Sequence, residues 1–179
     1  MKKVHVGCGR VNIPGFINVD RSNYKHVHYK RDVRDLRIFN KNSIDLIYAS
    51  HVLEYFDLYE AIDTLKEWRR VLKKGGILRI AVPNFEALIK VYKKTGNIDK
   101  IIGPLYGRIV QKKKKIYHKY VYDYKKIRFL LLKSGFKVVS KYNWKKTIHL
   151  NYDDCSQAYF PHMDKNRGIL VSLNVEAKK

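Results

Sequence analysis

The opening of the chain constrains its fold most strongly, because two short apolar runs there end in residues that suit a ligand site. Val4–Val6 leads into a Gly-Cys-Gly turn, and Phe16–Val19 leads into Asp20. A glycine turn lets the backbone approach a ligand closely, and neighbouring parallel strands end at the same edge of a sheet. A carboxylate at that edge can accept two hydrogen bonds from a ribose diol. The pattern therefore predicts an α/β protein that binds a nucleoside.

The kind of nucleoside is narrowed by two phosphate-binding patterns that the sequence lacks. Asn12 stands where a dinucleotide fingerprint needs its third glycine, and Asp20 follows too early for a full crossover helix. The lysine of a GxxxxGK[ST] phosphate loop is missing as well. These differences disfavour NAD and FAD and favour S-adenosylmethionine, a nucleoside without phosphate. The alternative is that Gly7 and Gly9 only turn the chain.

Length and composition predict one globular domain, residues 1–179. Of these 179 residues 45% are hydrophobic, and two are cysteines, Cys8 and Cys155. Such a length suits one domain, and two cysteines cannot form a disulfide framework, which favours a reducing compartment. No apolar stretch reaches the length of a membrane span. We therefore expect a soluble, cytoplasmic protein, and the sequence leaves its oligomeric state open.

Net charge is the outlier of the composition, at +22 from 38 basic and 16 acidic residues. Such a charge attracts nucleic acid, an anionic membrane surface or an acidic glycan. Lys112–Lys115 form a run of lysines, and Tyr24–Arg31 interleaves basic with aromatic residues. The excess of lysine over arginine also fits a compositional bias without function. The charge therefore indicates association with polyanions rather than a reaction type.

Strands and helices alternate through the first half of the chain, which is typical of a parallel sheet built from βαβ units. Strands are expected at Lys3–Val6, Phe16–Val19, Val27–Lys30, Ile44–Ala49 and Ile77–Val82. The clearest helix is expected from Leu58 to Lys73, because apolar residues recur there at helical spacing. Asp57 and Glu60 can form its capping box, and Gly75-Gly76 is expected to end it.

The second half of the chain has fewer clear elements. Asn84 can cap a helix that runs through Tyr92. Another helix is expected from Tyr124 to Ser134, with Ile127, Leu130 and Leu131 pointing inward, and strands are expected at Phe136–Tyr142 and Ile169–Val175. The expected architecture is a Rossmann-like, seven-stranded, mostly parallel sheet with helices on both faces.

Two segments with weaker patterns, Thr95–Tyr122 and Trp144–Arg167, are rich in tyrosine, lysine, histidine and aspartate. Loops at the carboxyl edge of an open α/β sheet build its binding site, so these segments are candidates for substrate contacts. We expect residues 1–94 to form the cofactor-binding half and residues 95–179 the substrate half.

Several motifs together resemble class I S-adenosylmethionine-dependent methyltransferases. They are Gly7-Cys-Gly9, Asp20, Asn42–Glu54 and Trp68–Gly76. More narrowly, the chain is similar to small methyltransferases found beside genes for surface-glycan assembly, over about its first half. The resemblance implies an enzyme of polysaccharide biosynthesis that binds S-adenosylmethionine and methylates a sugar hydroxyl of a glycan or glycolipid.

The resemblance also implies which residues contact the cofactor. Gly7, Cys8 and Gly9 would approach its amino-acid part and ribose, and Asp20 would bind the ribose hydroxyls. The family has an acid or amide after the third strand that contacts the adenine amine.

That position points to Asp32, next to Val33, with Asp35 as the rival. Ser50 and His51 would lie at the end of the fourth strand, beside the methyl group.

Methylation of a hydroxyl requires a base that removes its proton. His51 is the first candidate by location, and His118 and His162 follow because they lie in the segments expected to bind substrate. Each could instead be a packed or capping histidine. Glu54 is expected to brace the cofactor pocket. Asp153-Asp154 could hold sugar hydroxyls, but a turn or helix cap is the simpler interpretation, and no metal site is expected.

Two other functions stay open at this point. The charge favours an enzyme that methylates RNA or another nucleic acid, although Ser50-His-Val-Leu53 replaces the Asn-Pro-Pro-Tyr type of motif that amine methylation would use. A non-catalytic module that keeps the fold and binds anionic partners through its basic surface is the third hypothesis.

Overall fold

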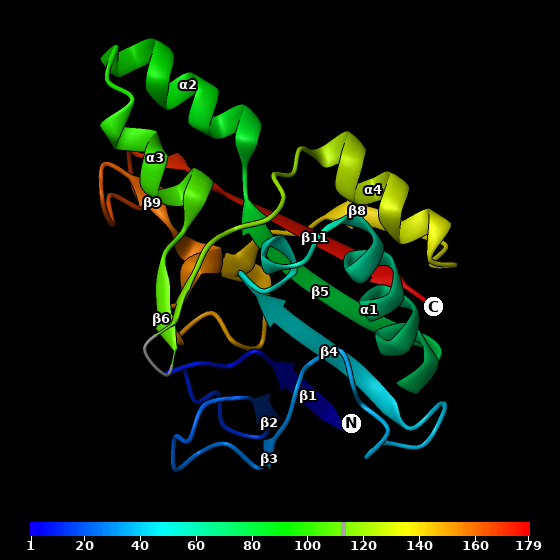
Figure 1. Cartoon of the computed structure of the whole chain (residues 1–179). Helices are drawn as coiled ribbons and strands as arrows, with labels where there is room; N and C mark the ends of the chain where they lie inside the picture. Colours follow the sequence, from blue (N-terminus) through cyan, green and yellow to red (C-terminus); the bar gives the residue numbers. More distant parts are fainter. Residues whose placement is uncertain (112–113) are drawn as a thin grey trace.

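A computed structural model of the chain describes residues 1–111 and 114–179 and is built on one seven-stranded sheet (Figure 1). The strands of the sheet are β1 (Lys3–Val6), β2 (Ile17–Asp20), β3 (Tyr29–Lys30), β4 (Ile44–Ser50), β5 (Leu72–Pro83), β8 (Val139–Lys141) and β11 (Ser172–Lys178). Their order is β3-β2-β1-β4-β5-β11-β8. The pairs from β3 to β5 are parallel, and β11 is antiparallel to both β5 and β8. The predicted Rossmann-like, mostly parallel sheet is confirmed.

Two α-helices, α1 (Leu58–Val71) and α4 (Tyr124–Lys133), cover one face of this sheet. The apolar sides of both helices share one core with alternate residues of the strands. Asp57 begins α1 by accepting hydrogen bonds from the backbone of Tyr59 and Glu60, and the Glu60 side chain accepts one from the Asp57 N–H. The predicted capping box and the inward side chains of α4 are therefore confirmed.

The opposite face of the sheet is covered mainly by irregular backbone with two short 3₁₀ helices, η2 (Trp144–Lys146) and η3 (Cys155–Gln157). A smaller apolar cluster lies there, made of Ile13, Phe16, Leu46 and Tyr48. Leu46 and Tyr48 point to this face because side chains alternate along β4. Helices thus lie on both faces, but those on this face are single turns.

The boundary between α1 and β5 differs from the prediction. The helix ends at Val71, and Leu72 is already extended and pairs with Ile44, so β5 contains Gly75 and Gly76. The prediction that the two glycines end the helix is wrong, because pairing with β4 extends the strand backward. Gly75 has a φ of +76°, which a glycine adopts without strain.

Other strands are shorter than predicted where the chain turns early. The third strand has only two residues, because the Val27 N–H bonds the Tyr24 carbonyl in a turn instead of a neighbouring strand. Phe136–Tyr142 forms a strand only over β8. The run Ile169–Val175 divides into β10 (Ile169–Leu170) and β11, which belong to different sheets.

Beyond the carboxyl edge of the sheet, the chain builds a small extension (Figure 1). Asn84 caps α2 (Phe85–Thr95), as predicted, and α2 packs against α3 (Asp99–Tyr106) and the β9–β10 ribbon, in which β9 is Tyr159–Phe160. A hairpin of β6 (Ile109–Gln111) and β7 (Lys114–Ile116) follows α3. Lys112 and Lys113 of the lysine run lie outside the described residues. None of the helices in the described part is long and apolar enough to cross a membrane.

Candidate functional site

The candidate site lies where the carboxyl ends of β1, β2 and β4 meet. The chain passes from β1 to β2 on one side and reaches β4 on the other, so the strand order reverses at β1. A crevice outside the strand ends at such a reversal is the usual ligand site of open α/β sheets. The glycine turn follows β1, Asp20 ends β2, and Ser50 ends β4. The fold therefore brings the three predicted groups to one edge.

The glycine turn needs both of its glycines, for different reasons. Gly7 has a φ of +66°, and a Cβ built on it would lie 2.4 Å from Cγ2 of Val52. Gly9 has a φ of +51°, but its Cβ would meet no atom within 4 Å. Gly7 thus allows close packing under the turn, whereas Gly9 leaves open space beside it. A ligand can approach the backbone there.

Asp20 is buried and held against this turn. Its Oδ2 accepts a hydrogen bond of 2.9 Å from the Gly9 N–H, and its Oδ1 accepts one of 2.7 Å from the Ser22 N–H. Each carboxylate oxygen retains capacity to accept a further bond, as a diol would need. Cys8 lies between the two glycines of the turn. Burial and the nearby charge of Asp20 raise the pKa of its thiol to about 12, so Cys8 stays neutral.

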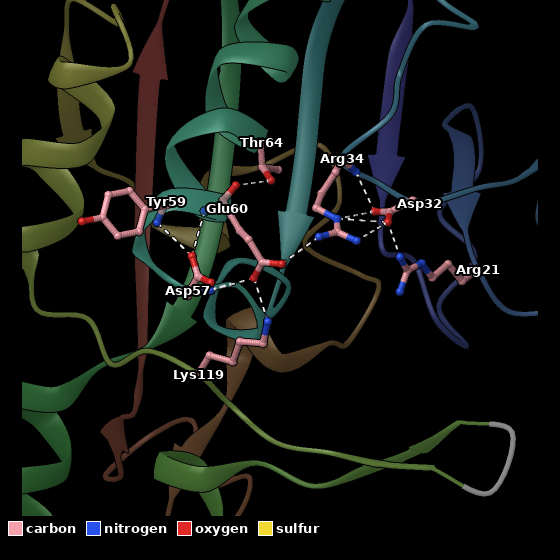
Figure 2. Close-up of polar contacts among 8 residues, drawn as sticks. All are labelled: Arg21, Asp32, Arg34, Asp57, Tyr59, Glu60, Thr64 and Lys119. Carbon is pink, nitrogen blue, oxygen red and sulfur yellow. Dashed lines mark hydrogen bonds and ion pairs between the residues drawn. The ribbon is translucent and has the colours of Figure 1, made fainter.

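Asp32 lies after β3 in a network of charged side chains (Figure 2). Arg34 contacts both of its oxygens, at 2.7 to 3.1 Å, and Arg21 pairs with Oδ2. Partial burial opposes ionisation, but the hydrogen bonds from Arg34 and the Arg21 charge lower the pKa of Asp32 below its usual value. Arg34 continues to Glu60, which also binds Lys119 at 2.8 Å, so the network joins the two halves of the chain.

Asp32, the residue predicted to contact adenine, therefore already forms ion pairs with two arginines. Asp35, the rival, is bound by Arg37 at 2.9 Å and by Arg31 at 3.3 Å. The carbonyl of Val33 accepts a 2.8 Å hydrogen bond from the buried Trp68 indole. The Val33 side chain packs in the main core, so both its side chain and its carbonyl are held in place.

His51 follows β4 directly and has an unusual backbone conformation. Its φ is +53°, in the left-handed region that few residues other than glycine adopt, although Asn, Asp and His do so more often than the rest. A 2.8 Å bond from its N–H to the Ala81 carbonyl holds it there. The side chain is 18% exposed, with Nδ1 lying 3.2 Å from Oε1 of Glu54 and Nε2 lying 3.4 Å from the Ser172 hydroxyl.

Glu54 is fully buried, and His118 approaches the same Oε1 with Nε2 at 3.9 Å. His118 Nδ1 lies 3.1 Å from the Leu105 carbonyl, which only a protonated nitrogen can bond. Burial lowers the pKa of His118 despite the charge of Glu54. The structure thus joins His51, Glu54 and His118 in one cluster. Sequence reasoning named all three but gave no sign that a carboxylate lies between two histidines.

The third predicted base lies apart from this cluster. His162 is exposed and lines a cavity of about 520 Å³ between α2, α3 and β9, together with Leu88, Lys100 and Phe160. Asp154 caps η3 and accepts a 2.6 Å bond from the Tyr48 hydroxyl, which favours the structural interpretation of the Asp153-Asp154 pair. Within residues 1–111 and 114–179, no group of three or more His, Cys, Asp or Glu side chains could hold a metal ion.

A second histidine cluster, which the sequence analysis missed, lies on the opposite face of the sheet. His5 and His149 stack on Tyr48, with ring centroids 5.1 and 4.1 Å away. Both histidines are buried, and burial lowers the pKa of each to about 4 although Asp154 opposes the shift. The alternation of Lys3–Val6 could have placed His5 opposite Val4 and Val6, but nothing in the sequence indicates His149 as its neighbour.

Comparison with known proteins agrees with this geometry. Residues 5–80 match a methyltransferase domain family. The solved structure of a methyltransferase from Thermotoga maritima, described as S-adenosylmethionine-dependent and as a possible histamine N-methyltransferase, superposes with a TM-score of 0.60 at 20% identity, covering 99% of this chain and 82% of that one. The curated proteins contain no match.

Two further structures described as S-adenosylmethionine-dependent methyltransferases show the same fold. One from Archaeoglobus fulgidus has a TM-score of 0.60 at 18% identity, covering 99% of this chain and 86% of that one. One from Methanosarcina mazei has a TM-score of 0.57 at 17% identity, covering 99% and 92%. The domain match includes the glycine turn, Asp20 and His51, and the shared fold extends over the whole sheet. Residues 5–80 thus match a methyltransferase domain, and the whole chain shares its fold with S-adenosylmethionine-dependent methyltransferases.

Proposed function

We propose that the chain methylates a hydroxyl group, in particular a sugar hydroxyl of a glycan or glycolipid, as a step of polysaccharide biosynthesis in the cytoplasm. The observation that carries this proposal is the pair of His51 and Glu54 at the end of β4. An alcohol is a poor nucleophile until its proton is removed, and a positioned histidine is the usual base. A methyltransferase that acts on a thiol would have little need of such a pair.

We assign the tautomer of His51 from its nearest charge. Nδ1 lies 3.2 Å from the buried Glu54 carboxylate, whose oxygens have no hydrogen-bond partner in the described residues, so a proton on Nδ1 is favoured by that charge. Nε2 then has a free lone pair and can take the proton of an acceptor hydroxyl. Glu54 stabilises the resulting imidazolium, since a buried negative charge favours a neighbouring positive one. Nε2, on the other side of the ring, lies 3.4 Å from the hydroxyl oxygen of Ser172.

The residues at the strand ends suit the cofactor. S-adenosylmethionine supplies, when bound, a methyl group that its sulfonium has made electrophilic. Gly9 offers open space beside its backbone, and Asp20 would accept hydrogen bonds from the ribose hydroxyls. We further propose that Asp32 and the backbone of Val33 border the adenine, and that Ser50, whose buried hydroxyl has no hydrogen-bond partner in the described part of the chain, lines the same crevice.

The nucleic-acid alternative rests on the net charge of +22. It would place the same base and cofactor residues beside a nucleotide hydroxyl. The two hypotheses differ only in the molecule that accepts the methyl group. The test must therefore offer both glycan and RNA acceptors to the same purified protein.

The test is transfer of a labelled methyl group by the purified protein into cell fractions of glycolipid, polysaccharide and RNA. We expect label in a glycan-containing fraction, and label confined to RNA would contradict the proposal. Asp20→Ala should weaken S-adenosylmethionine binding about 10- to 150-fold, the value of one charge-assisted hydrogen bond of roughly 1.5 to 3 kcal/mol. Calorimetry measures this affinity.

Asp63→Ala is the matched control, because Asp63 is a highly exposed carboxylate on α1. Its affinity for the cofactor should equal that of the unaltered protein. An unchanged affinity in Asp20→Ala would remove the ribose assignment but not the proposed acceptor.

A further inference from the structure

The segment that follows α2 exposes a row of large apolar side chains. Ile98, Ile102 and Tyr106 recur every four residues, so they lie along one side of α3, and they are 51%, 41% and 61% exposed. Ile101, on the other side, is buried against α2. Single exposed apolar residues are common, but a continuous row of them marks an interaction surface.

The β6–β7 hairpin follows the row in the chain and exposes two more apolar side chains, one on each of its faces. Ile109 and Val110 are exposed, and Val110 lies opposite Lys115 in the register of the hairpin. The two strands form a separate sheet that projects from the body of the molecule (Figures 1 and 2). An isolated two-stranded hairpin has little stability of its own, so a surface that covers its apolar side chains would stabilise it.

Basic side chains follow the apolar row in the chain. Arg108 and Lys114 are exposed, and the exposed Lys115 lies opposite Val110 in the hairpin. Between residues 85 and 119 the sequence has ten lysines and arginines and only two acids, Glu86 and Asp99. The partner of this surface must therefore combine an apolar layer with negative charge.

We propose that α3 and the β6–β7 hairpin dock on a membrane surface that contains anionic phospholipids. Aliphatic and tyrosine side chains can enter the boundary between headgroups and acyl chains, while lysines contact the phosphates. Nucleic acid is bound largely by stacking on aromatic rings, whereas four of the five exposed apolar side chains of this surface, Ile98, Ile102, Ile109 and Val110, are aliphatic. This inference goes beyond methyl transfer, because it concerns where the enzyme works.

The docking surface is connected directly to the candidate site. The N–H of His118 donates a 2.7 Å bond to the carbonyl of Tyr106, at the end of α3. The next N–H, of Lys119, donates a 2.8 Å bond to the carbonyl of Glu54. One short stretch of backbone therefore joins the end of α3 to the backbone of Glu54, whose carboxylate lies beside His51. An acceptor carried by a lipid would reach the site from this side.

Sedimentation with vesicles tests the proposal. The full chain, at about 0.1 M salt, is mixed with vesicles of phosphatidylcholine alone or of phosphatidylcholine with phosphatidylglycerol. We expect binding to the anionic vesicles and weak or no binding to the neutral ones. Ile102→Asp should weaken binding roughly tenfold or more, because a buried apolar contact is replaced by a repelled charge.

Phe129→Asp is the matched control. Phe129 is 54% exposed on α4, with Lys126 and Lys133 over its ring, so it places a similar apolar and basic surface elsewhere on the molecule. It should bind vesicles like the unaltered protein. Should Ile102→Asp fail to fold, the double variant Arg108→Glu with Lys114→Glu tests the same surface through its charge.

Several results would overturn the proposal. The protein could bind both vesicle types equally or bind neither. Ile102→Asp and Phe129→Asp could weaken vesicle binding equally. Ile102→Asp could also lose vesicle binding only because it converts a dimer into a monomer. RNA could also displace the protein from vesicles. If the Ile102→Asp variant then bound RNA as well as the unaltered protein does, the surface would be a nucleic-acid site that does not use the apolar row. Vesicle binding requires neither cofactor nor turnover, so these results stay readable even if the chain methylates no hydroxyl.

Discussion

Two histidine clusters lie on the same sheet, and their surroundings give them different chemistry. His51 and His118 flank the buried carboxylate of Glu54 at the end of β4. His5 and His149 instead stack on Tyr48 on the other face, and burial lowers the pKa of both to about 4. The first cluster places a carboxylate beside a partly exposed imidazole at the strand ends, whereas the second buries both rings against a tyrosine. We therefore expect proton transfer only from the first cluster and treat the second as structural.

The largest effect expected from this contrast is on turnover. His51→Asn should lower the rate of methyl transfer about 10²- to 10⁴-fold, because it removes the base. Asparagine is the suitable replacement, since it tolerates the left-handed backbone of position 51. Single-turnover transfer of labelled methyl measures the rate, and cofactor affinity should not change.

His149→Phe is the comparison variant, and it should leave the methyl-transfer rate unchanged. If the two variants lost the same activity, the division into a chemical and a structural cluster would be wrong. A normal rate in His51→Asn would reject His51 as the base.

The second expected effect is on stability in acid. Folded His5 and His149 have pKa values of about 4, below the ordinary value of 6.5, so the unfolded chain binds more protons between these limits. Stability should therefore fall as pH decreases from 6.5 to 4, by up to about 1.4 kcal/mol per pH unit for each histidine. Urea unfolding at several pH values measures the slope.

His149→Phe sharpens this measurement because it removes one titrating ring and keeps an aromatic side chain on Tyr48. The slope between pH 6.5 and 4 should become shallower by the share of one histidine. His162→Gln, at an exposed position, should leave the slope unchanged. A slope that His149→Phe does not alter would show that other groups cause the acid sensitivity.

The smallest effect is expected at the hydroxyl of Tyr48. It donates a 2.6 Å hydrogen bond to Asp154, which caps η3. Tyr48→Phe should lower the free energy of unfolding by about 1 to 3 kcal/mol, because one buried bond is lost and its partner is left without it. Thermal or urea unfolding near pH 7 measures this loss, with unchanged methyl transfer as the control. A loss of activity in Tyr48→Phe would connect the two clusters.

The first half of the chain, residues 1–94, could be predicted from sequence better than the second half, residues 95–179. Strand ends such as Asp20 and His51 follow from local patterns, and parallel pairing brings them to one edge. The capping of α1 by Asp57 is equally local. The approach of His118 to Glu54 depends on how a long, weakly patterned segment returns to the sheet, which no local pattern encodes. The same holds for the stack of His149 on Tyr48.

The end of α1 shows that even a clear local signal can predict the wrong boundary. A glycine pair is normally a good stop signal for a helix, but here pairing of Leu72 with Ile44 ends the helix earlier. Long-range pairing outweighed the local preference. The contact of Asp32 with adenine stays a prediction. The ion pairs of Asp32 with Arg21 and Arg34 could not be predicted from the spacing of these residues in the sequence.

The close approach of Gly7 to Val52 has an evolutionary consequence. A Cβ at position 7 would lie 2.4 Å from Cγ2 of Val52, the residue after His51. The turn after β1 and the loop after β4 are therefore packed directly against each other. A larger side chain on either partner must be matched by a smaller one on the other, so related chains should exchange these two positions as a pair.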